Sequence, residues 1–190
     1  MDVEFTREGP IATLTLNRPE KLNALTHEMP LAIADHVNTI NADPDLRVIV
    51  LTSKGRAFCS GADVSKMGHA DILATRRSLA DYHHKATLAL ANSSKPVIAA
   101  VRGHAVGVGF SLALACDLVI ASETAKFSMI FKRIGVVPDG GGMFFLTQRM
   151  GVAQAKDLIF TARIVEAAEA KSLGIVSRVV PDAKLEDEAR

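Results

Sequence analysis

Cysteine is scarce in this sequence, and neither sign of charge is in excess. Two cysteines, Cys59 and Cys116, give no disulfide framework and no Cys-x-x-Cys pair. The 22 basic and 21 acidic residues are interspersed, so the sequence has no electrostatic footprint for nucleic acid. No apolar run approaches the length that crosses a membrane, and the start "MDVEFTREG" lacks the pattern of a secretory signal. These absences favour a soluble cytoplasmic protein without nucleic-acid or membrane partners.

The apolar residues, 48% of the chain, come in short segments that alternate between strand and helix patterns. Residues 11–17 alternate in the manner of a strand. Residues 47–53 and 96–103 are continuous apolar runs, typical of strands covered on both faces. Apolar residues recur at helical spacing between positions 29 and 40, and a longer helical stretch is predicted over 71–91. This alternation predicts an α/β domain with a largely parallel sheet.

Three glycine-bearing loops are candidates for chemistry, because α/β proteins place their sites at strand ends. They are "GRAFCSGADV", "RGHAVGVGFSLALACD" and "RIGVVPDGGGMFF". The second loop lacks the third glycine of a dinucleotide fingerprint and the Lys-Ser/Thr of a P-loop. All six histidines precede Ser111, which is the wrong order for a nucleophile elbow. His83 and His84 are adjacent and would point about 100° apart on a helix, so no metal site is predicted.

What the second loop offers is backbone amide groups. Glycine allows a ligand to approach the backbone closely. A helix that begins near Val108 would leave amides pointing outward from its N-terminus, with the positive end of the helix dipole behind them. Such donors stabilise a developing oxyanion, and losing one typically costs about 2.7–4 kcal/mol of barrier.

Five segments together resemble the enoyl-CoA hydratase/isomerase (crotonase) superfamily: "LNRPEKLNAL", "AFCSGADV", "KPVIAAVRGHAVGVGFSLALACDLVIAS", "AKFSMIFKRIGVVPDGGG" and "AKSLGIVSRVVPD". The resemblance runs in register over the whole chain. It implies a crotonase-like α/β fold of repeated ββα units that form two roughly perpendicular sheets. It also implies an acyl-CoA thioester substrate, with no cofactor besides the coenzyme A of that substrate, and a homotrimer or dimer of trimers. Residues 1–190 are expected to be a single crotonase-like domain that lacks the C-terminal helical segment usual in the family.

The resemblance also implies roles for individual residues. The two oxyanion-hole amides correspond to Ala62 and Val108, the latter at a position where many members have glycine. The residues implied in binding the coenzyme A substrate are Lys21, Leu22, Ala24, Ala62, Asp63, Val64, Ser65, Gly107 and Phe131.

The departures from the family pattern decide the expected reaction. The two glutamates of a hydratase correspond to Ser111 and Phe131, neither of which is a general acid–base near neutral pH. Asp139 occupies the position of the catalytic acid in several isomerases of the superfamily. The 1,2-epoxyphenylacetyl-CoA isomerases resemble this chain through "LALACD" and "IGVVPDGGG". A 1,3-proton shift needs only one base, so the sequence predicts an enoyl-CoA isomerase with Asp139 as that base. Pro-Asp-Gly is also ordinary turn chemistry, and the two interpretations are compatible.

Five apolar residues are expected near Asp139, where they would desolvate its carboxyl group and raise its pKa. They are Phe110, Met129, Phe131, Met143 and Phe144. For Met143 and Phe144, simple core packing is the alternative. For Cys59, burial as a structural cysteine is expected.

Three other functions stay open. One is an enoyl-CoA hydratase that uses Asp139 with a bound water. A second is a thioester hydrolase with Ser111 as nucleophile, for which no base is identifiable. The third is a non-catalytic scaffold or RNA-binding member, which is disfavoured because the helix with Lys66, Arg76, Arg77 and Lys85 carries few basic residues.

Overall fold

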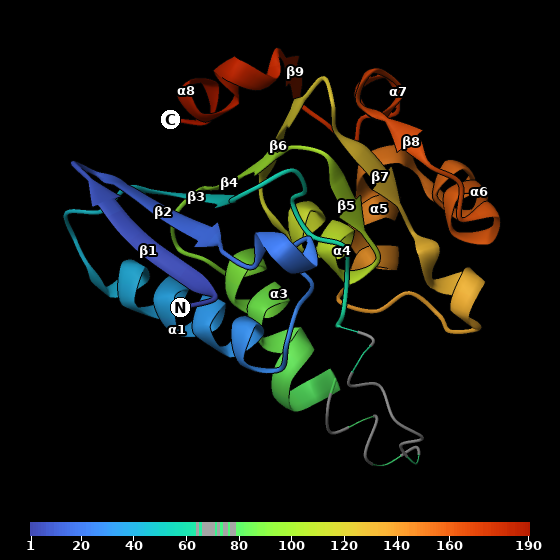
Figure 1. Ribbon diagram of the computed structural model, residues 1–190, viewed down its shortest axis with the longest axis horizontal. Helices are drawn as coiled ribbons and strands as arrows, with labels where there is room; N and C mark the ends of the chain where they lie inside the picture. The colour runs from blue at the N-terminus through green and yellow to red at the C-terminus, as the bar shows by residue number, and fades with distance from the viewer. Residues whose placement is uncertain (64, 66–70, 72, 74–75, 77–78) are drawn as a thin grey trace.

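The computed structural model describes residues 1–63, 65, 71, 73, 76 and 79–190 (Figure 1). Their strands form two sheets. The six-stranded sheet has the order β1 (Val3–Glu8), β2 (Ile11–Leu16), β3 (Val48–Ser53), β4 (Val97–Val101), β6 (Leu118–Ser122) and β9 (Arg178–Val180). The three-stranded sheet has the order β5 (His104–Val106), β7 (Lys126–Ser128) and β8 (Val165–Glu166).

The helices follow the strands along the chain. The α-helices are α1 (Glu28–Ala42), α3 (His84–Ala91), α4 (Val108–Ala115), α5 (Gly142–Met150), α6 (Val152–Thr161), α7 (Ala167–Ser172) and α8 (Leu185–Ala189). Short 3-10 turns are η1 (Pro19–Lys21), η4 (Ile130–Ile134) and η5 (Asp182–Lys184), and a π-helical turn, η3 (Leu79–His83), leads into α3. No helix within the described part of the chain is long and apolar enough to cross a membrane.

The six-stranded sheet is largely parallel. Only the β1–β2 hairpin is antiparallel among its pairs, and the pairs β2–β3, β3–β4, β4–β6 and β6–β9 are all parallel. Parallel strands end at one edge of the sheet, so the segments that follow β3 and β4 leave the sheet side by side. The sequence prediction of a largely parallel α/β architecture is confirmed.

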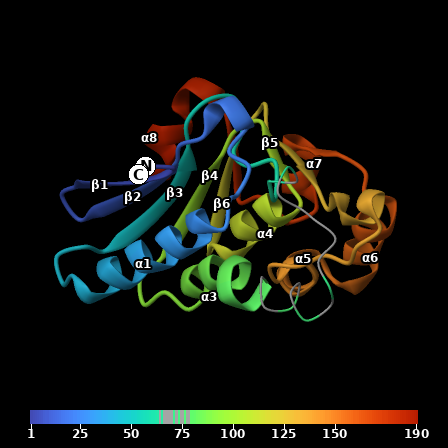
Figure 2. The same ribbon diagram turned by 60° about the horizontal axis from the view of Figure 1, so that its bottom comes forward.

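Helices cover both faces of this sheet. Helices α1 and α3 pack together along one face, and α8 lies on the other (Figure 2). The apolar stripe of α1 is fully buried, because Met29, Ile33, Val37 and Ile40 recur on the side that faces the sheet. On the opposite face, Leu185 of α8 packs in a smaller cluster with the sheet residues Val50, Ala100 and Ile120.

Three short strands were not predicted from the sequence. The loop 102–117 was expected to be irregular before its helix, yet residues 104–106 form β5 and pair with β7. Strands of two or three residues carry too little alternation to be recognised, and only their partners define them. Of the helical stretch predicted over 71–91, the structure describes the helix from Leu79 onward, and several earlier residues lie outside the described part.

Candidate active site

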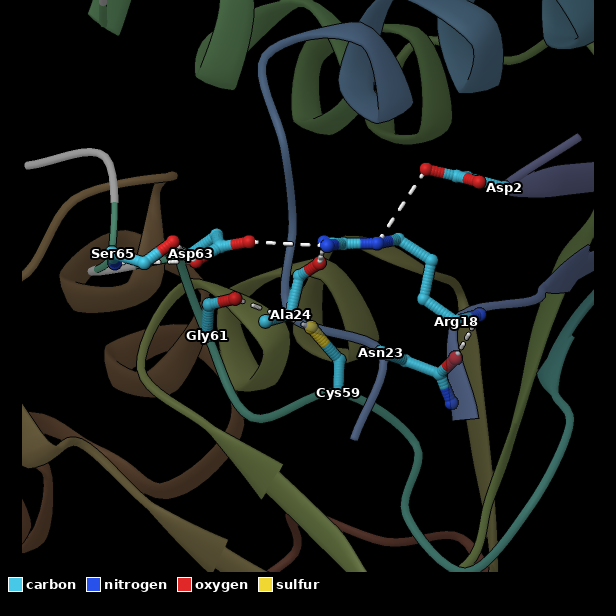
Figure 3. A network of polar contacts seen from close by, with 8 residues as sticks. All are labelled: Asp2, Arg18, Asn23, Ala24, Cys59, Gly61, Asp63 and Ser65. Atoms are coloured by element: carbon cyan, nitrogen blue, oxygen red, sulfur yellow. Dashed lines mark hydrogen bonds and ion pairs between the residues drawn. The ribbon is translucent and has the colours of Figure 1, made fainter. Parts of the chain in front are cut away.

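A buried asparagine, shown with its bond to Arg18 in Figure 3, ties the loop of residues 18–25 to the segment that follows β3. Asn23 is fully buried, and its Nδ2 donates to the backbone oxygens of Lys54 at 2.9 Å and Ala57 at 2.8 Å. Its Oδ1 accepts a hydrogen bond of 2.7 Å from the backbone N–H of Arg18. Asn23 has a positive φ of 54°, which asparagine tolerates better than most residues. One side chain therefore fixes two loops that are more than thirty positions apart.

Arg18 holds the next part of the same network. Its guanidinium donates to the Ala24 backbone oxygen at 2.6 Å and pairs with Asp63 at 3.2 Å (Figure 3). Asp63 also accepts a 2.6 Å hydrogen bond from the Ser65 hydroxyl. The Ser65 hydroxyl first, and then Arg18, hold the pKa of Asp63 below its ordinary value. Neither Arg18 nor Asn23 was singled out in the sequence, although both belong to the motif "LNRPEKLNAL".

The backbone N–H of Ala62 stays free because of the way its segment pairs with the segment of Leu25. Leu25 and Ala62 form a parallel bridge, in which Leu25 N–H donates to Gly61 O at 2.8 Å and Asp63 N–H donates to Leu25 O at 2.9 Å. Successive N–H groups of an extended segment point to opposite sides, so the Ala62 N–H points away from this bridge. Within the described residues it donates to no acceptor.

The amide of Val108 is free because it opens a helix. Val108 is the first residue of α4 and follows Gly107, whose φ of 56° and ψ of −127° turn the chain sharply. The first amides of a helix have no partner inside it. In the part of the chain that is described, the Val108 N–H has no acceptor outside the helix either. The predicted helix start at Val108 is confirmed.

The segments that carry these two amides are in direct contact. A Cβ on Gly109 would lie 2.6 Å from the Cβ, Sγ and backbone O of Cys59, and a Cβ on Gly61 would lie 3.2 Å from Val106 O. A second parallel bridge, between Cys59 and Ala105, joins the same two segments. Only glycine permits this approach. The contact brings the loops of Ala62 and Val108 together, as an oxyanion hole requires.

The loop of Asp139 is packed onto the start of α4. The Ser111 hydroxyl is fully buried and donates to the backbone oxygen of Asp139 at 3.0 Å. A Cβ on the next residue, Gly140, would lie 3.1 Å from Val108 Cγ2 and 3.1 Å from Ser111 Cβ. The residue that follows Asp139 therefore packs against Val108, whose amide is free. Because Ser111 gives its proton to a backbone carbonyl, its geometry argues against a role as nucleophile.

The carboxyl group of Asp139 is poorly satisfied for its degree of burial. Its Oδ1 is buried and has no hydrogen-bond partner among the described residues. Burial raises the pKa of Asp139 above its ordinary value, and the electrostatic interaction with His84 opposes that shift. A carboxyl group with a raised pKa exchanges protons more readily near neutral pH, which suits a general base. The rise in the pKa of Asp139 that the sequence predicted therefore agrees with the burial of its carboxyl group in the structure.

The sequence matches the family model for enoyl-CoA hydratase/isomerase over residues 6–190. The chain belongs to the enoyl-CoA hydratase/isomerase family. It is 42% identical over 185 residues to a probable enoyl-CoA hydratase, echA8, of Mycobacterium bovis, covering 97% of this chain and 70% of that one. It is 38% identical over 188 residues to the 1,2-epoxyphenylacetyl-CoA isomerase of Escherichia coli, covering 96% of this chain and 71% of that one.

A solved structure of a putative enoyl-CoA hydratase/isomerase family protein from Hyphomonas neptunium superimposes with a TM-score of 0.95. It is 38% identical in sequence, and the match covers all of this chain and 73% of the other. The crotonase-like fold predicted from the sequence motifs is thereby confirmed.

In this enoyl-CoA hydratase/isomerase family member, the other residues implied in binding coenzyme A lie around the same loops. Lys21 and Ser65 are exposed, and Leu22 and Ala24 are half-buried. The ring of Phe131 would be 3.8 Å from a Cβ on Gly107. Val64 lies outside the described residues, as do Lys66 and Arg77 of the helix considered for RNA binding. The coenzyme A contacts of these residues stay predictions.

The apolar neighbours expected around Asp139 divide into two groups. Phe110, Met129 and Phe131 are buried in the core. Met143 and Phe144, in the first turn of α5, are 48% and 62% exposed, so the alternative that they pack in the core is wrong. A Cβ on Gly142, the first residue of α5, would lie 2.6 Å from Ser111 Oγ, so the helix starts against α4, and the two residues that follow Gly142 are exposed.

Cys59, on the loop of Ala62, lies in an environment that suppresses the reactivity of its thiol in this family member. Cys59 is fully buried, and burial raises the pKa of its thiol to about 12, so it carries no thiolate near neutral pH. The expectation of a structural cysteine is confirmed. Within the described residues, no group of three or more histidine, cysteine or acidic side chains is placed to hold a metal ion.

Proposed function

We propose that this family member is an enoyl-CoA isomerase that converts 3-enoyl-CoA to 2-enoyl-CoA, or shifts a double bond in a related ring-type acyl-CoA, with Asp139 as base. One observation carries the proposal. Asp139 has a half-buried carboxyl group with an unpartnered oxygen, and its loop packs against Val108, whose amide is free. The segment of Val108 in turn contacts the segment of Ala62.

The reaction consists of two proton transfers by Asp139, with the two amides stabilising the intermediate between them. Asp139 removes a proton from C2 of the 3-enoyl thioester, and the electrons move onto the thioester oxygen. The amides of Ala62 and Val108 donate hydrogen bonds to this oxyanion and stabilise the dienolate. Asp139 then returns the proton at C4, which leaves the double bond between C2 and C3 and regenerates the carboxylate. One base suffices, so the absence of glutamate at Ser111 and Phe131 does not impede this reaction.

The acyl-CoA substrate is proposed to lie along the loops of residues 18–25 and 61–65. The Asn23 and Arg18 network supports this proposal, because it holds both loops in a single geometry before any ligand arrives. Pre-ordered loops lose less entropy on binding than mobile ones. A homotrimer or a dimer of trimers is part of the proposal, on the ground of the family resemblance, and sedimentation equilibrium tests it.

Hydration of a 2-enoyl-CoA is the second candidate function. The names of relatives favour it, since echA8 of Mycobacterium bovis and a short-chain enzyme of Clostridium acetobutylicum are both called enoyl-CoA hydratases. In this chain Asp139 would have to act with a bound water, because the positions of both hydratase glutamates hold other residues.

A side-by-side assay distinguishes the two candidates. Purified protein is given a 3-enoyl-CoA and, separately, a 2-enoyl-CoA of the same chain length, and kcat/KM is measured for each. We expect isomerisation to be the faster reaction. A hydration rate well above the isomerisation rate would make the hydratase the main activity and overturn the proposal.

A further inference from the structure

Two buried oxygen atoms near the candidate base have no hydrogen-bond partner among the described residues. One is Oδ1 of Asp139, and the other is Oγ1 of Thr87, which lies on α3 and is 4% exposed. A threonine inside a helix commonly bonds to the carbonyl one turn earlier, and Thr87 does not. Unsatisfied buried polar groups are rare in native proteins and each one needs a physical explanation.

The two oxygens belong to one neighbourhood. Thr87 Oγ1 would lie 3.5 Å from a Cβ on Gly140, the residue that follows Asp139. The threonine hydroxyl therefore lies against the residue that follows the candidate base in the chain. His84, which interacts electrostatically with Asp139, lies one helical turn before Thr87 and therefore on the same side of α3. Thr87 and His84 thus both lie on the side of α3 that faces the loop of Asp139.

Their chemistry is complementary around a single water molecule. A hydroxyl group both donates and accepts, and a carboxylate only accepts. A buried water typically makes two to four hydrogen bonds to groups that would otherwise be unsatisfied. A water between these oxygens would accept a hydrogen bond from Thr87 and donate one to Asp139, which leaves a lone pair for attack.

We propose that Thr87 and Asp139 together bind the water molecule that this site adds to a 2-enoyl-CoA, with Thr87 as a positioning residue. The inference rests on hydration, the second candidate under the proposed function, and it uses the same base and the same two amides. Asp139 takes a proton from the water as the water oxygen bonds to C3. The electrons of the double bond move onto the thioester oxygen, and protonated Asp139 then gives that proton to C2. One water is consumed, and the carboxylate is restored.

This arrangement separates the two reactions of the site. The proton shift of isomerisation involves only the substrate and Asp139, so it does not need Thr87. Hydration needs the water to be held in line with C3, which requires the hydroxyl group. Loss of that hydroxyl should therefore change the ratio of hydration to isomerisation, which a merely structural role of Thr87 would leave constant.

The experiment compares Thr87→Val, Thr87→Ser and Ser53→Ala with the unaltered protein, with both rates measured for each. Thr87→Val keeps the shape of the side chain and removes the hydroxyl, so we expect hydration to fall about tenfold and isomerisation to stay within about twofold. Thr87→Ser keeps the hydroxyl and should restore the ratio. Ser53→Ala removes another buried, unpartnered hydroxyl, on β3, and should leave the ratio unchanged.

The outcomes separate this inference from the proposed function. Equal loss of both reactions in Thr87→Val, or no change in either, overturns the water site while leaving the isomerase proposal intact. Absence of any hydration by the unaltered protein also overturns it. If Thr87→Val does not fold, as judged by its thermal transition, Thr87→Ala gives the same comparison. Asp139→Asn that still isomerises at the normal rate would instead contradict the proposed function.

Discussion

The two sides of the candidate site differ in how their buried polar groups are satisfied. On the side of the loops proposed to bind coenzyme A, Asn23 uses both its donors and its acceptor, and Arg18 is paired with Asp63. On the side of the base, Thr87 and Asp139 each keep a buried oxygen without a partner in the described chain. The Asn23 and Arg18 side chains are paired, although Thr26, next to their loop, also keeps a buried Oγ1 without a partner in the described chain; the carboxyl group of the base has bonding capacity in reserve.

This difference matches the tasks proposed for the two sides. A loop that only has to present amides gains from being rigid, because donors held in place need no reorganisation during the reaction. A base has to bind and release a proton, so a carboxyl group already satisfied by the protein would be a weaker one. Leaving buried oxygens without partners on the side of the base lowers the stability of the fold, and active sites commonly give up stability for activity in this way.

Asp139→Asn should have the largest effect of the changes that test this comparison. Asparagine adopts the same turn but cannot accept the proton, so we expect isomerisation to fall by about 10²- to 10⁴-fold. Substrate affinity should change little, because the coenzyme A loops are untouched. Turnover and ligand binding are measured beside Asp187→Asn, an exposed control on α8. A stable, ligand-binding and fully active variant would leave Asp139 as a turn residue only.

Val108→Pro tests the amide at the start of α4, against which the loop of the base packs. Proline is tolerated at the first position of a helix, which Val108 occupies, but it has no N–H to donate. We expect turnover to fall by about 10²- to 10³-fold, while Val108→Gly, which keeps the amide, retains much of the activity. Circular dichroism checks that both variants fold. Full activity of a folded proline variant would show that this amide is not an oxyanion donor.

Asn23→Ala should break the hydrogen-bond network of Asn23 and Arg18. It removes three hydrogen bonds, so the backbone N–H of Arg18 and the backbone oxygens of Lys54 and Ala57, of which Ala57 is buried, lose this partner. We expect a loss of at least about 2 kcal/mol in the free energy of unfolding. The control is Asn92→Ala, where an exposed side chain makes one local bond, and there we expect a change within about 0.5 kcal/mol. Similar losses in the two variants would contradict the role given to Asn23.

The pH dependence of stability should show the smallest effect. Because the pKa of Asp139 is raised in the folded state, its neutral form is favoured there, and ionisation costs stability. The stability contributed by Asp139 is therefore full below the unfolded pKa and is lost as pH rises through the folded pKa. Asp139→Asn does not ionise, so its stability relative to the unaltered protein should increase over that range. Denaturant unfolding at a series of pH values measures this, and a constant difference would refute it.

Much of the fold could be predicted from residue patterns. The apolar runs that became β3 and β4, the stripe on α1 and the start of α4 at Val108 all followed from local periodicity and glycine placement. The short strands β5, β7 and β8 could not, because pairing with distant segments defines them. The outward position of Met143 and Phe144 likewise depends on how closely the loop before α5 packs on α4.

For the site, the sequence by itself determined which groups are present: one acid in a glycine-rich turn, two glycine-bearing loops able to offer amides, and no second carboxyl group at Ser111 or Phe131. Only the tertiary structure decided which of these groups are satisfied. Asn23 and Arg18 are occupied, and Thr87 and Asp139 are not, because hydrogen bonding of a buried group depends on partners from distant segments. Residue types set the available chemistry, and packing decides which atoms remain free to perform it.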